Sequence, residues 1–273
     1  MNKVLHNPLA LIGFVIIAGI LFMALIAPLI APYDPDAINV KAILLSPTAN
    51  HLMGTDGLGR DVFTRMLYGS RISLMVGFVA VGIATAIGII LGAIAGFYRG
   101  WVDTVIMRVV DVMLSIPTFF LILAVIAFLT PSIWNIMIVI GLTSWMGVTR
   151  LVRAEFLSLR NREFVLAAQA LGAKDARLIF THLLPNSLTP IIVSSILGIA
   201  SAVLVESGLS FLGLGVQAPQ ASWGNILTDG KEYIQFAWWL SLFPGLAILI
   251  TVLGYNLLGD GLRDAYNPRT SQH

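Results

Sequence analysis

The chain has 273 residues, of which 58% are hydrophobic and 11% charged, whereas soluble domains are roughly 45–50% apolar and about 25% charged. This composition excludes an ordinary soluble globule. The 16 basic and 14 acidic residues nearly cancel, so the net charge gives no reason to expect nucleic-acid binding, and the lack of cysteine excludes disulfides and thiol nucleophiles.

Apolar length is the main structural signal. A bilayer crossing requires roughly 20 consecutive, mainly apolar residues, and six stretches qualify: 9–31, 72–97, 105–129, 133–152, 187–205 and 236–258. The first could be read as a secretory signal because Lys3 precedes it, but it exceeds the apolar core of a signal peptide, so we expect a retained anchor. The sequence therefore predicts an all-α, polytopic membrane protein with six transmembrane helices.

The distribution of lysine and arginine predicts the orientation of these spans. With both termini in the cytoplasm, most basic residues near the span ends fall on the cytoplasmic side, many of them within 150–177. Arg60, Arg65 and Arg71 cluster before the second span and oppose this assignment. We expect both termini and residues 153–185 inside, and residues 207–235 outside.

The first outer segment, 32–71, has two parts. Residues 32–53 are rich in proline, asparagine and aspartate, which predicts irregular chain. Residues 55–70 place apolar side chains opposite charged ones, which predicts a short amphipathic helix, closed by Gly69, that anchors the second span. The expected organisation is a tail and first span (1–31), this outer segment (32–71), a five-span core (72–260) and a cytoplasmic tail (261–273).

Two patterns within the spans concern helix packing and bending. Gly88, Gly92 and Gly96 form a GxxxGxxxG stripe, which favours close approach of another helix, either within the chain or from a second subunit. Pro117 and Pro244 remove helix hydrogen bonds and predict kinks.

Few ionisable groups lie within the spans, where a charge is costly and suggests function. Arg108 and Asp111 stand three residues apart on one helical face, so we expect a structural ion pair. Glu206 closes the fifth span and is either an interfacial residue or part of a pathway exit. The candidate pathway or gate residues are Met113, Pro117, Glu206 and Phe211.

Catalytic and metal-binding motifs are missing from the sequence. It contains no HExxH, no GxSxG and no GxxxxGK[ST] pattern, and its four histidines lie far apart. We therefore expect no enzymatic activity, no catalytic residue, no metal site and no cofactor on this chain.

The segment 150–186 is charged but keeps a helical apolar period up to Gly172 and again up to Pro185. Glycine permits a left-handed turn and proline stops a helix, so the segment predicts a helix, an elbow and a second helix between spans four and five. A small, rigid and charged knuckle should project from the membrane.

The residues of this knuckle carry a family resemblance. AAQALG at 167–172 and LLP at 183–185 resemble the EAA motif of ABC importer permeases, although Leu166 and His182 stand where Glu and Ile are usual. Further blocks occur in the order found in C-type permeases of peptide and nickel importers: GTDGLGRDVFTRMLYGSRISL, DVMLSIPTFF, REFVLAAQALGA, HLLPNSLTPIIV and ESGLSFLGLGVQAPQASWG. The resemblance covers nearly the whole chain.

The resemblance implies a permease subunit in a bacterial cytoplasmic (inner) membrane. Its implied partners are a B-type permease subunit, two cytoplasmic ATPase subunits that bind ATP and magnesium, and an extracytoplasmic substrate-binding protein. The elbow would be a coupling helix seated in a groove of an ATPase subunit, and the implied coupling residues are Ala167, Ala168, Gly172, Ala173, Lys174, Asp175 and Pro185. The expected substrates are di- or oligopeptides, with nickel or glutathione as alternatives.

Two other classes of protein compete with this interpretation. An ion-coupled secondary transporter predicts inverted repeats and paired acids at mid-membrane, whereas the sequence shows no convincing repeat. An intramembrane enzyme or a purely structural subunit is the second alternative, and the lack of a nucleophile, base or metal cluster counts against the enzyme.

Overall fold

The computed structural model describes residues 7–266. This part of the chain is helical and contains no named strand, only an isolated bridge between Thr55 and Asp61. Residues 1–6, which include Lys3, and 267–273, which form most of the expected cytoplasmic tail, lie outside the described range. The elements are α2 (Pro8–Ile30), η1 (Val40–Ala42), α3 (Val62–Tyr98), α4 (Gly100–Ser115), α5 (Thr118–Ile126), α6 (Ile133–Leu142), α7 (Trp145–Leu159), α8 (Glu163–Ala170), α9 (Asp175–Arg177), η2 (Leu178–Leu183), α10 (Leu184–Phe211), α11 (Trp223–Glu232) and α12 (Trp239–Tyr266).

Five helical stretches among residues 7–266 are long and apolar enough to cross a membrane, and the bent pair α4 and α5 meets the same criteria when the two helices are taken together as one span. The two helices of this pair meet at 82°. Pro117 caps α5, and Ile116 before it is extended, because the proline ring disfavours helical backbone in the preceding residue. The predicted kink is thus a full break, whereas α12 continues through Pro244.

The expected amphipathic helix before the second span is not a separate element. Val62–Tyr98 is one continuous helix, begun by Asp61, whose carboxylate accepts a hydrogen bond from the backbone N–H of Thr64 at 2.8 Å. Gly69 does not close a helix but lies within α3 against the backbone of Ser222. Helix α3 therefore runs through the division predicted at residue 71, and α12 runs through the one at 261.

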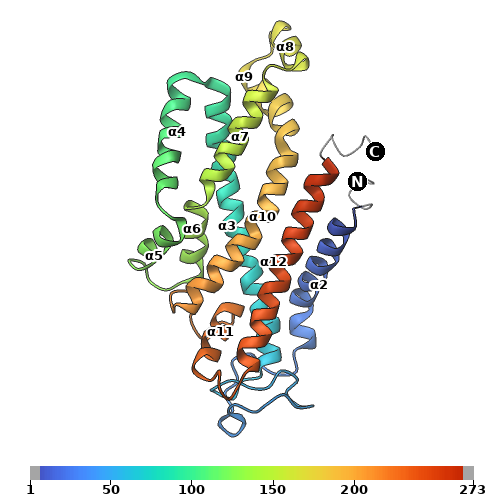
Figure 1. Cartoon of the computed structure of the whole chain (residues 1–273), viewed down its shortest axis with the longest axis vertical. Helices are drawn as coiled ribbons and strands as arrows, with labels where there is room; N and C mark the ends of the chain where they lie inside the picture. The colour runs from blue at the N-terminus through green and yellow to red at the C-terminus, as the bar shows by residue number, and fades with distance from the viewer. Residues whose placement is uncertain (1–6, 267–273) are drawn as a thin grey trace.

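The elements are sorted between two ends of an elongated bundle (Figure 1). Helices α8 and α9 project at one end, which we call the knuckle end, and the loop between α2 and α3 lies with α11 at the other, the loop end. The start of α2 and the last turns of α12 point toward the knuckle end, and Asn7 Nδ2 donates to the carbonyl oxygen of Gly261 at 3.3 Å.

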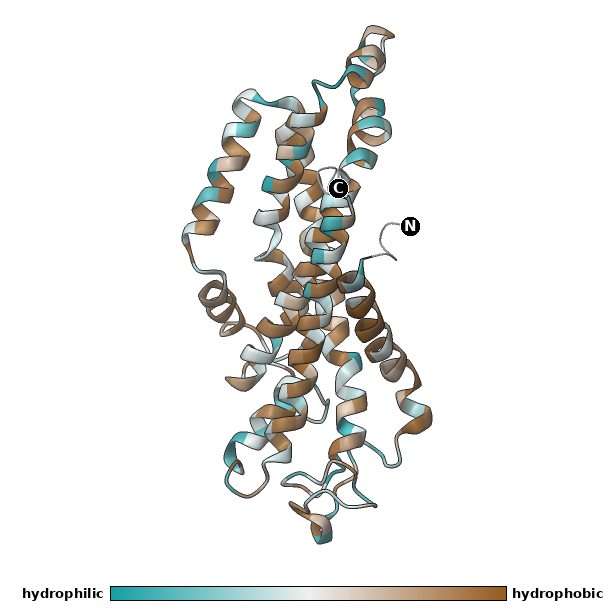
Figure 2. Cartoon of the chain, turned by 45° about the vertical axis from the view of Figure 1, so that its right-hand side comes forward, coloured by the Kyte–Doolittle hydropathy of each residue, from teal (hydrophilic) through white to brown (hydrophobic). Residues whose placement is uncertain are grey.

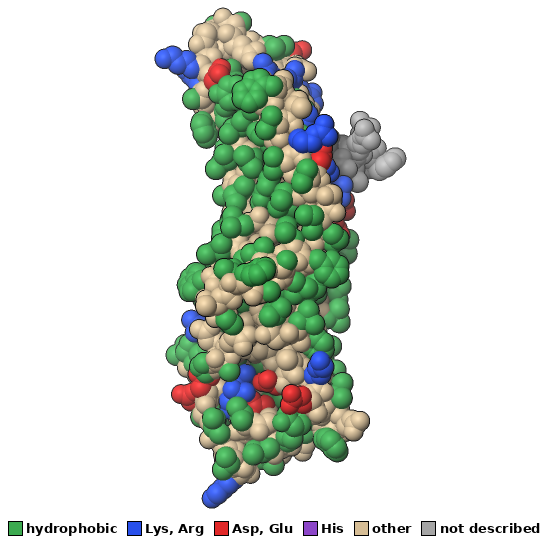
Figure 3. Space-filling view, turned by 90° about the vertical axis from the view of Figure 1, so that its left-hand side faces the viewer, with side chains coloured by type: hydrophobic (Ala, Val, Ile, Leu, Met, Phe, Trp, Pro, Cys, Tyr) green, Lys and Arg blue, Asp and Glu red, His purple; other side chains and the backbone are tan. Residues whose placement is uncertain are grey.

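Hydropathy follows the same division. The middle of the bundle is mainly hydrophobic, and more hydrophilic residues appear at the loop end and along the upper helices (Figure 2). On the face seen in Figure 3, charged side chains collect toward both ends and leave a hydrophobic band between them. This distribution suits a bundle that is surrounded by lipid around its middle.

The glycine stripe of α3 packs against α7 of the same chain. A Cβ atom added to Gly88 would lie 2.5 Å from Cβ of Val148, and one added to Gly92 would lie 2.6 Å from the carbonyl oxygen of Thr149. Gly96 meets Phe156 in the same way. The two backbones can approach this closely only because these positions lack side chains.

Glu206 holds together the loop end of the bundle. Its carboxyl is fully buried, and Oε1 accepts hydrogen bonds from the hydroxyls of Ser210 (2.8 Å) and Ser222 (2.9 Å). Ser73 and Ser207 contribute longer bonds to Oε2. Ser73, Ser210 and Ser222 each also accept a backbone N–H, which directs their own protons toward the carboxyl. One side chain thus joins α3, α10 and the start of α11.

The glycine packing predicts a position-specific effect of one methyl group. Gly92→Ala should lower the free energy of unfolding by about 1–3 kcal/mol because the new Cβ overlaps α7. Gly82→Ala in the same helix is the control, since nothing lies within 4 Å of its added Cβ. Denaturant unfolding in detergent measures both, and equal effects of the two substitutions would contradict the packing assigned to Gly92.

The Glu206 network predicts a second stability effect. Glu206→Gln should destabilise the bundle by about 1–3 kcal/mol because the amide removes an acceptor from a buried cage of donors. Glu232→Gln, at an exposed glutamate of α11, should change stability by less than about 0.5 kcal/mol. The thermal midpoints of the purified variants in detergent test this, and an unchanged midpoint for Glu206→Gln would show that the cage is dispensable.

Candidate functional site

The knuckle is built around a helix stop at Gly172. Helix α8 ends at Ala170, and Gly172 has φ +79°, a left-handed conformation that favours glycine. Its N–H donates to Gln169 O at 2.9 Å, and that of Ala173 donates to Ala168 O at 3.0 Å. These two bonds form a Schellman motif, which satisfies the last carbonyls of α8 and turns the chain into α9.

The predicted coupling residues lie together on this knuckle, but they differ in exposure. Ala168 and Ala173 are half-buried against a small core that includes Val165, Leu178 and Leu183. The others are exposed, namely Ala167, Gly172, Lys174, Asp175 and Pro185. One side of the knuckle is therefore supported by packing, and the other is open to solvent.

The helix end predicted at Pro185 is wrong. The proline does not end a helix, because the chain is helical from Asp175 through η2 and α10 to Phe211. Pro185 lies in the first turn of α10, and the six residues before α10 form a π-helix in which the N–H of Leu184 donates to Ile179 O. A π-turn next to proline accommodates the ring and the missing N–H without breaking the rod.

The open side of the knuckle is apolar at its tip. Leu171 is 89% exposed, and Phe164, Leu166 and Phe180 are exposed as well. Several exposed large apolar side chains on one short segment are typical of a protein–protein contact. The knuckle thus has exposed apolar side chains on one side and a packed base on the other.

Ion pairs and a capping bond connect the helices below the knuckle. The guanidinium of Arg153 makes two hydrogen bonds to Asp103, and Arg160 donates to the carbonyl oxygen of Phe97. Asp111 pairs with Arg150 of α7. The predicted pair between Arg108 and Asp111 is therefore wrong, because α7 brings a second arginine to Asp111 from across the bundle.

The four candidate pathway residues do not form one site. Met113 packs beside a core of Val110, Trp145 and Met146, and Pro117 lies at the break between α4 and α5. Glu206 is not accessible, because the serine cage encloses it. Phe211 lies beneath the Lys231 ammonium, 5.3 Å from Nζ to the ring centroid.

A groove along α10 is the feature that the sequence analysis missed. A cavity of about 940 Å³ lies toward the knuckle end and adjoins one of about 240 Å³ deeper in the bundle, with Gly147 and Ser194 lining both. We call the two together the α10 groove. The polar side chains that line it are Thr85, Ser144, Glu155, Asn186, Thr189, Ser194, Ser195, Ser201 and Arg263.

A signal for this groove was present in the sequence. Ser194, Gly198 and Ser201 stand at i, i+4 and i+7, so they form a stripe of small and hydroxyl residues on one face of α10. Thr85 of α3 lies opposite, with its hydroxyl 2.9 Å from that of Ser195. Hydrogen-bonding groups at the centre of an apolar bundle offer a route for a polar solute.

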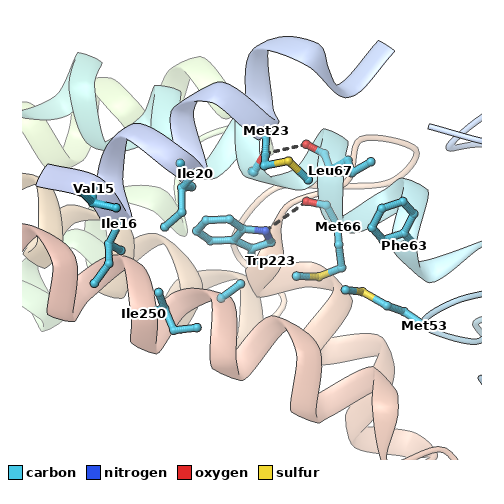
Figure 4. Close-up of a pocket in the computed structure, with 13 residues that line it drawn as sticks. Val15, Ile16, Ile20, Met23, Met53, Phe63, Met66, Leu67, Trp223 and Ile250 are labelled. Atoms are coloured by element: carbon cyan, nitrogen blue, oxygen red, sulfur yellow. Dashed lines mark hydrogen bonds between the residues drawn. The ribbon is translucent and has the colours of Figure 1, made fainter. Parts of the chain in front are cut away.

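The pocket in Figure 4 has a different character. It has a volume of about 390 Å³ and lies between α2, α3 and α12, with apolar side chains such as Ile16, Ile20 and Ile250 around it. The Trp223 indole closes one side and donates to Met66 O at 3.2 Å. Ser70 is the one hydroxyl residue among its lining residues. Such a pocket can hold hydrocarbon but cannot orient a polar solute.

At the loop end, a buried charge cluster fixes the loop between α2 and α3. Arg60 bonds to Asp56 at 2.7 Å and approaches Asp229 of α11 at 3.4 Å. Arg65 is 2% exposed and lies 3.6 Å from Asp56. Burial raises the pKa of Asp229, and the charges of Arg65 and Arg60 oppose that rise. The opposite charges connect the loop to α3 and α11.

Metal ligands do not gather anywhere within residues 7–266. No group of three or more His, Asp or Glu side chains there is arranged to hold an ion. The candidate site has two features, the knuckle with its exposed apolar side chains and the hydroxyl-lined α10 groove.

Comparison with known proteins places the chain in a family. Residues 88–272 match the binding-protein-dependent transport system inner membrane component, and residues 2–47 match the N-terminal transmembrane domain of oligopeptide transport permease C. A dipeptide transport system permease protein of Alkalihalophilus pseudofirmus is 47% identical over 96% of this chain and 86% of its own length. An oligopeptide transport system permease protein of Bacillus subtilis is 40% identical over 98% of this chain and 88% of its own.

Solved structures share the fold at lower identity. An inward-facing structure of the MetNI methionine ABC transporter contains a chain with a TM-score of 0.61 and 18% identity, covering 76% of this chain and 98% of that one. An amino acid ABC transporter gives a TM-score of 0.56 at 14% identity over 73% of this chain. From the match over 88–272 and the close relatives along its length, the chain belongs to the binding-protein-dependent transport system inner membrane components, the permease subunits of ABC importers.

Proposed function

We propose that this permease subunit imports di- or oligopeptides and that the α10 groove is its half of the translocation path. The observation that carries the substrate class is the identity of 40–47% to permeases named for dipeptide and oligopeptide transport, over at least 96% of this chain. The hydroxyl and amide groups of the groove support it, because they can bond the main chain of a peptide whatever its side chains are.

The knuckle is the proposed contact with an ATPase subunit. Its exposed apolar tip fits a groove on a protein partner, and its packed base joins it to α10 without an intervening loop. ATPase closure can then move α10 as a stiff body. ATP and magnesium are bound by two such partners, and the chain itself holds no cofactor.

The remaining partners follow from the same scheme. A B-type permease subunit supplies the other half of the path, and an extracytoplasmic binding protein delivers substrate at the loop end. The membrane is the bacterial cytoplasmic membrane, with both termini in the cytoplasm, which agrees with the start of α2 and the end of α12 pointing toward the knuckle end.

Nickel and glutathione are the alternative substrates. The residues that line the α10 groove include hydroxyls but no histidine or methionine, the side chains that a nickel route would favour. Glutathione is itself a peptide. Competition between glutathione and dipeptides for uptake by the assembled importer distinguishes these two substrates.

The orientation can be tested directly because the chain contains no native cysteine. Cysteines introduced at Ser158 or Lys174 should resist an impermeant thiol reagent added to intact cells, and one at Gln217 should react. All three positions are exposed in the chain. Labelling of Lys174→Cys from outside would reverse the proposed topology.

The coupling role can be tested at Gly172. Gly172→Val should abolish uptake and peptide-stimulated ATP hydrolysis, because a β-branched residue resists φ +79° and would distort the docking surface. Gly213→Val is the matched control, since Gly213 has the same φ of +79° and equally open surroundings but lies at the loop end.

Membrane levels and copurification of the ATPase subunits should accompany these assays. We expect Gly172→Val to insert normally and to lose its ATPase partners, whereas Gly213→Val keeps them. Wild-type uptake by a correctly inserted Gly172→Val complex would refute the coupling role.

A further inference from the structure

The α10 groove carries its charged lining residues at one end. Glu155 and Arg263 both line the wider cavity, toward the knuckle end, and the narrower cavity is lined by uncharged residues. Gly147, Leu151 and Glu155 follow one another at intervals of four along α7, so one helical face leads from the narrow cavity to the carboxylate. Arg263 reaches the same cavity from α12.

Both charges lack a counter-ion within residues 7–266. No ion pair there involves Glu155 or Arg263, although neighbouring arginines of α7 are engaged, Arg150 with Asp111 and Arg153 with Asp103. Glu155 is half-buried, where an unpaired carboxylate is costly, and Arg263 is exposed. Two unpaired charges of opposite sign therefore face one cavity.

From this arrangement we infer that the wide cavity is a binding site for the charged ends of a peptide, with Glu155 accepting the α-ammonium group and Arg263 the α-carboxylate. The assignment rests on the proposed function and adds a site to it. A metal cation or a lone anion would require charges of one sign, whereas a zwitterion requires both. A guanidinium binds a carboxylate through two parallel hydrogen bonds, and an ammonium donates to a carboxylate.

The same cavity suits the part of a peptide between its ends. Its volume of about 940 Å³ admits a short peptide, and Asn186, Thr189 and Ser194 line it with amide and hydroxyl groups that can bond main-chain atoms. A site of this kind recognises the termini and the main chain of a peptide and does not distinguish between peptides by their side chains. It lies at the end of the groove from which an imported peptide would be released.

The experiment uses the assembled importer in nanodiscs, without ATP or binding protein, and measures equilibrium binding of three probes: Ala-Ala, N-acetyl-Ala-Ala and Ala-Ala amide. Glu155→Gln should weaken Ala-Ala binding about 10-fold, which corresponds to about 1.4 kcal/mol, and should leave N-acetyl-Ala-Ala binding unchanged. Arg263→Gln should weaken Ala-Ala to a similar extent and leave the amide unchanged. Arg108→Gln and Asp260→Asn, at exposed charges outside the groove, are the matched controls.

Three results would overturn the site. The first is equal binding of all probes by wild type and variants, and the second is a loss that is the same for all three probes. The third is failure of Glu155→Gln to assemble with the second permease subunit while Arg263→Gln assembles and binds normally, since that assigns the carboxylate to a subunit contact. If the wild-type complex takes up neither dipeptides nor oligopeptides, the proposed function fails, whereas peptide uptake with unaltered variant binding removes the site alone.

Discussion

A buried carboxyl group determines how the loop end of this bundle is built. Glu206 pairs with no cation within residues 7–266, and a carboxyl within an apolar bundle is stable only where donors surround it. The donors come from α3, α10 and the N-cap of α11, so these three elements must converge. Trp223 then packs between them, and α11 is held against the bundle.

The packed helices α3 and α7 connect that junction to the knuckle. The glycines of α3 let α7 approach backbone to backbone, and Phe156 at the end of α7 belongs to the same core as Leu178 and Leu183 beneath the knuckle. A force at the knuckle is therefore passed to packed helices. Interfaces of this density move as units and deform little.

The sequence predicted well those features that depend on local chemistry. Apolar length indicated the spans, and Gly172 marked the elbow because a left-handed turn favours glycine. Features that depend on tertiary neighbours were missed. Asp111 had a nearby arginine in sequence at Arg108, yet Arg150 reaches it from another helix, and charged residues at the start of α3 suggested a surface helix although Arg65 is buried by the loop and α11.

The π-helix η2 sets the angular relation between the knuckle and the groove. A π-turn holds one residue more than an α-turn, so it rotates the following helix by about 100° relative to the preceding one. Leu178–Leu183 occupies the stretch between α9, which is part of the knuckle, and α10, whose stripe of Ser194, Gly198 and Ser201 lines the groove. This one extra residue therefore sets the rotation of α10 about its axis relative to the knuckle. If the π-turn became a regular α-helix with the same sequence, the hydroxyl stripe of α10 would rotate away from α3.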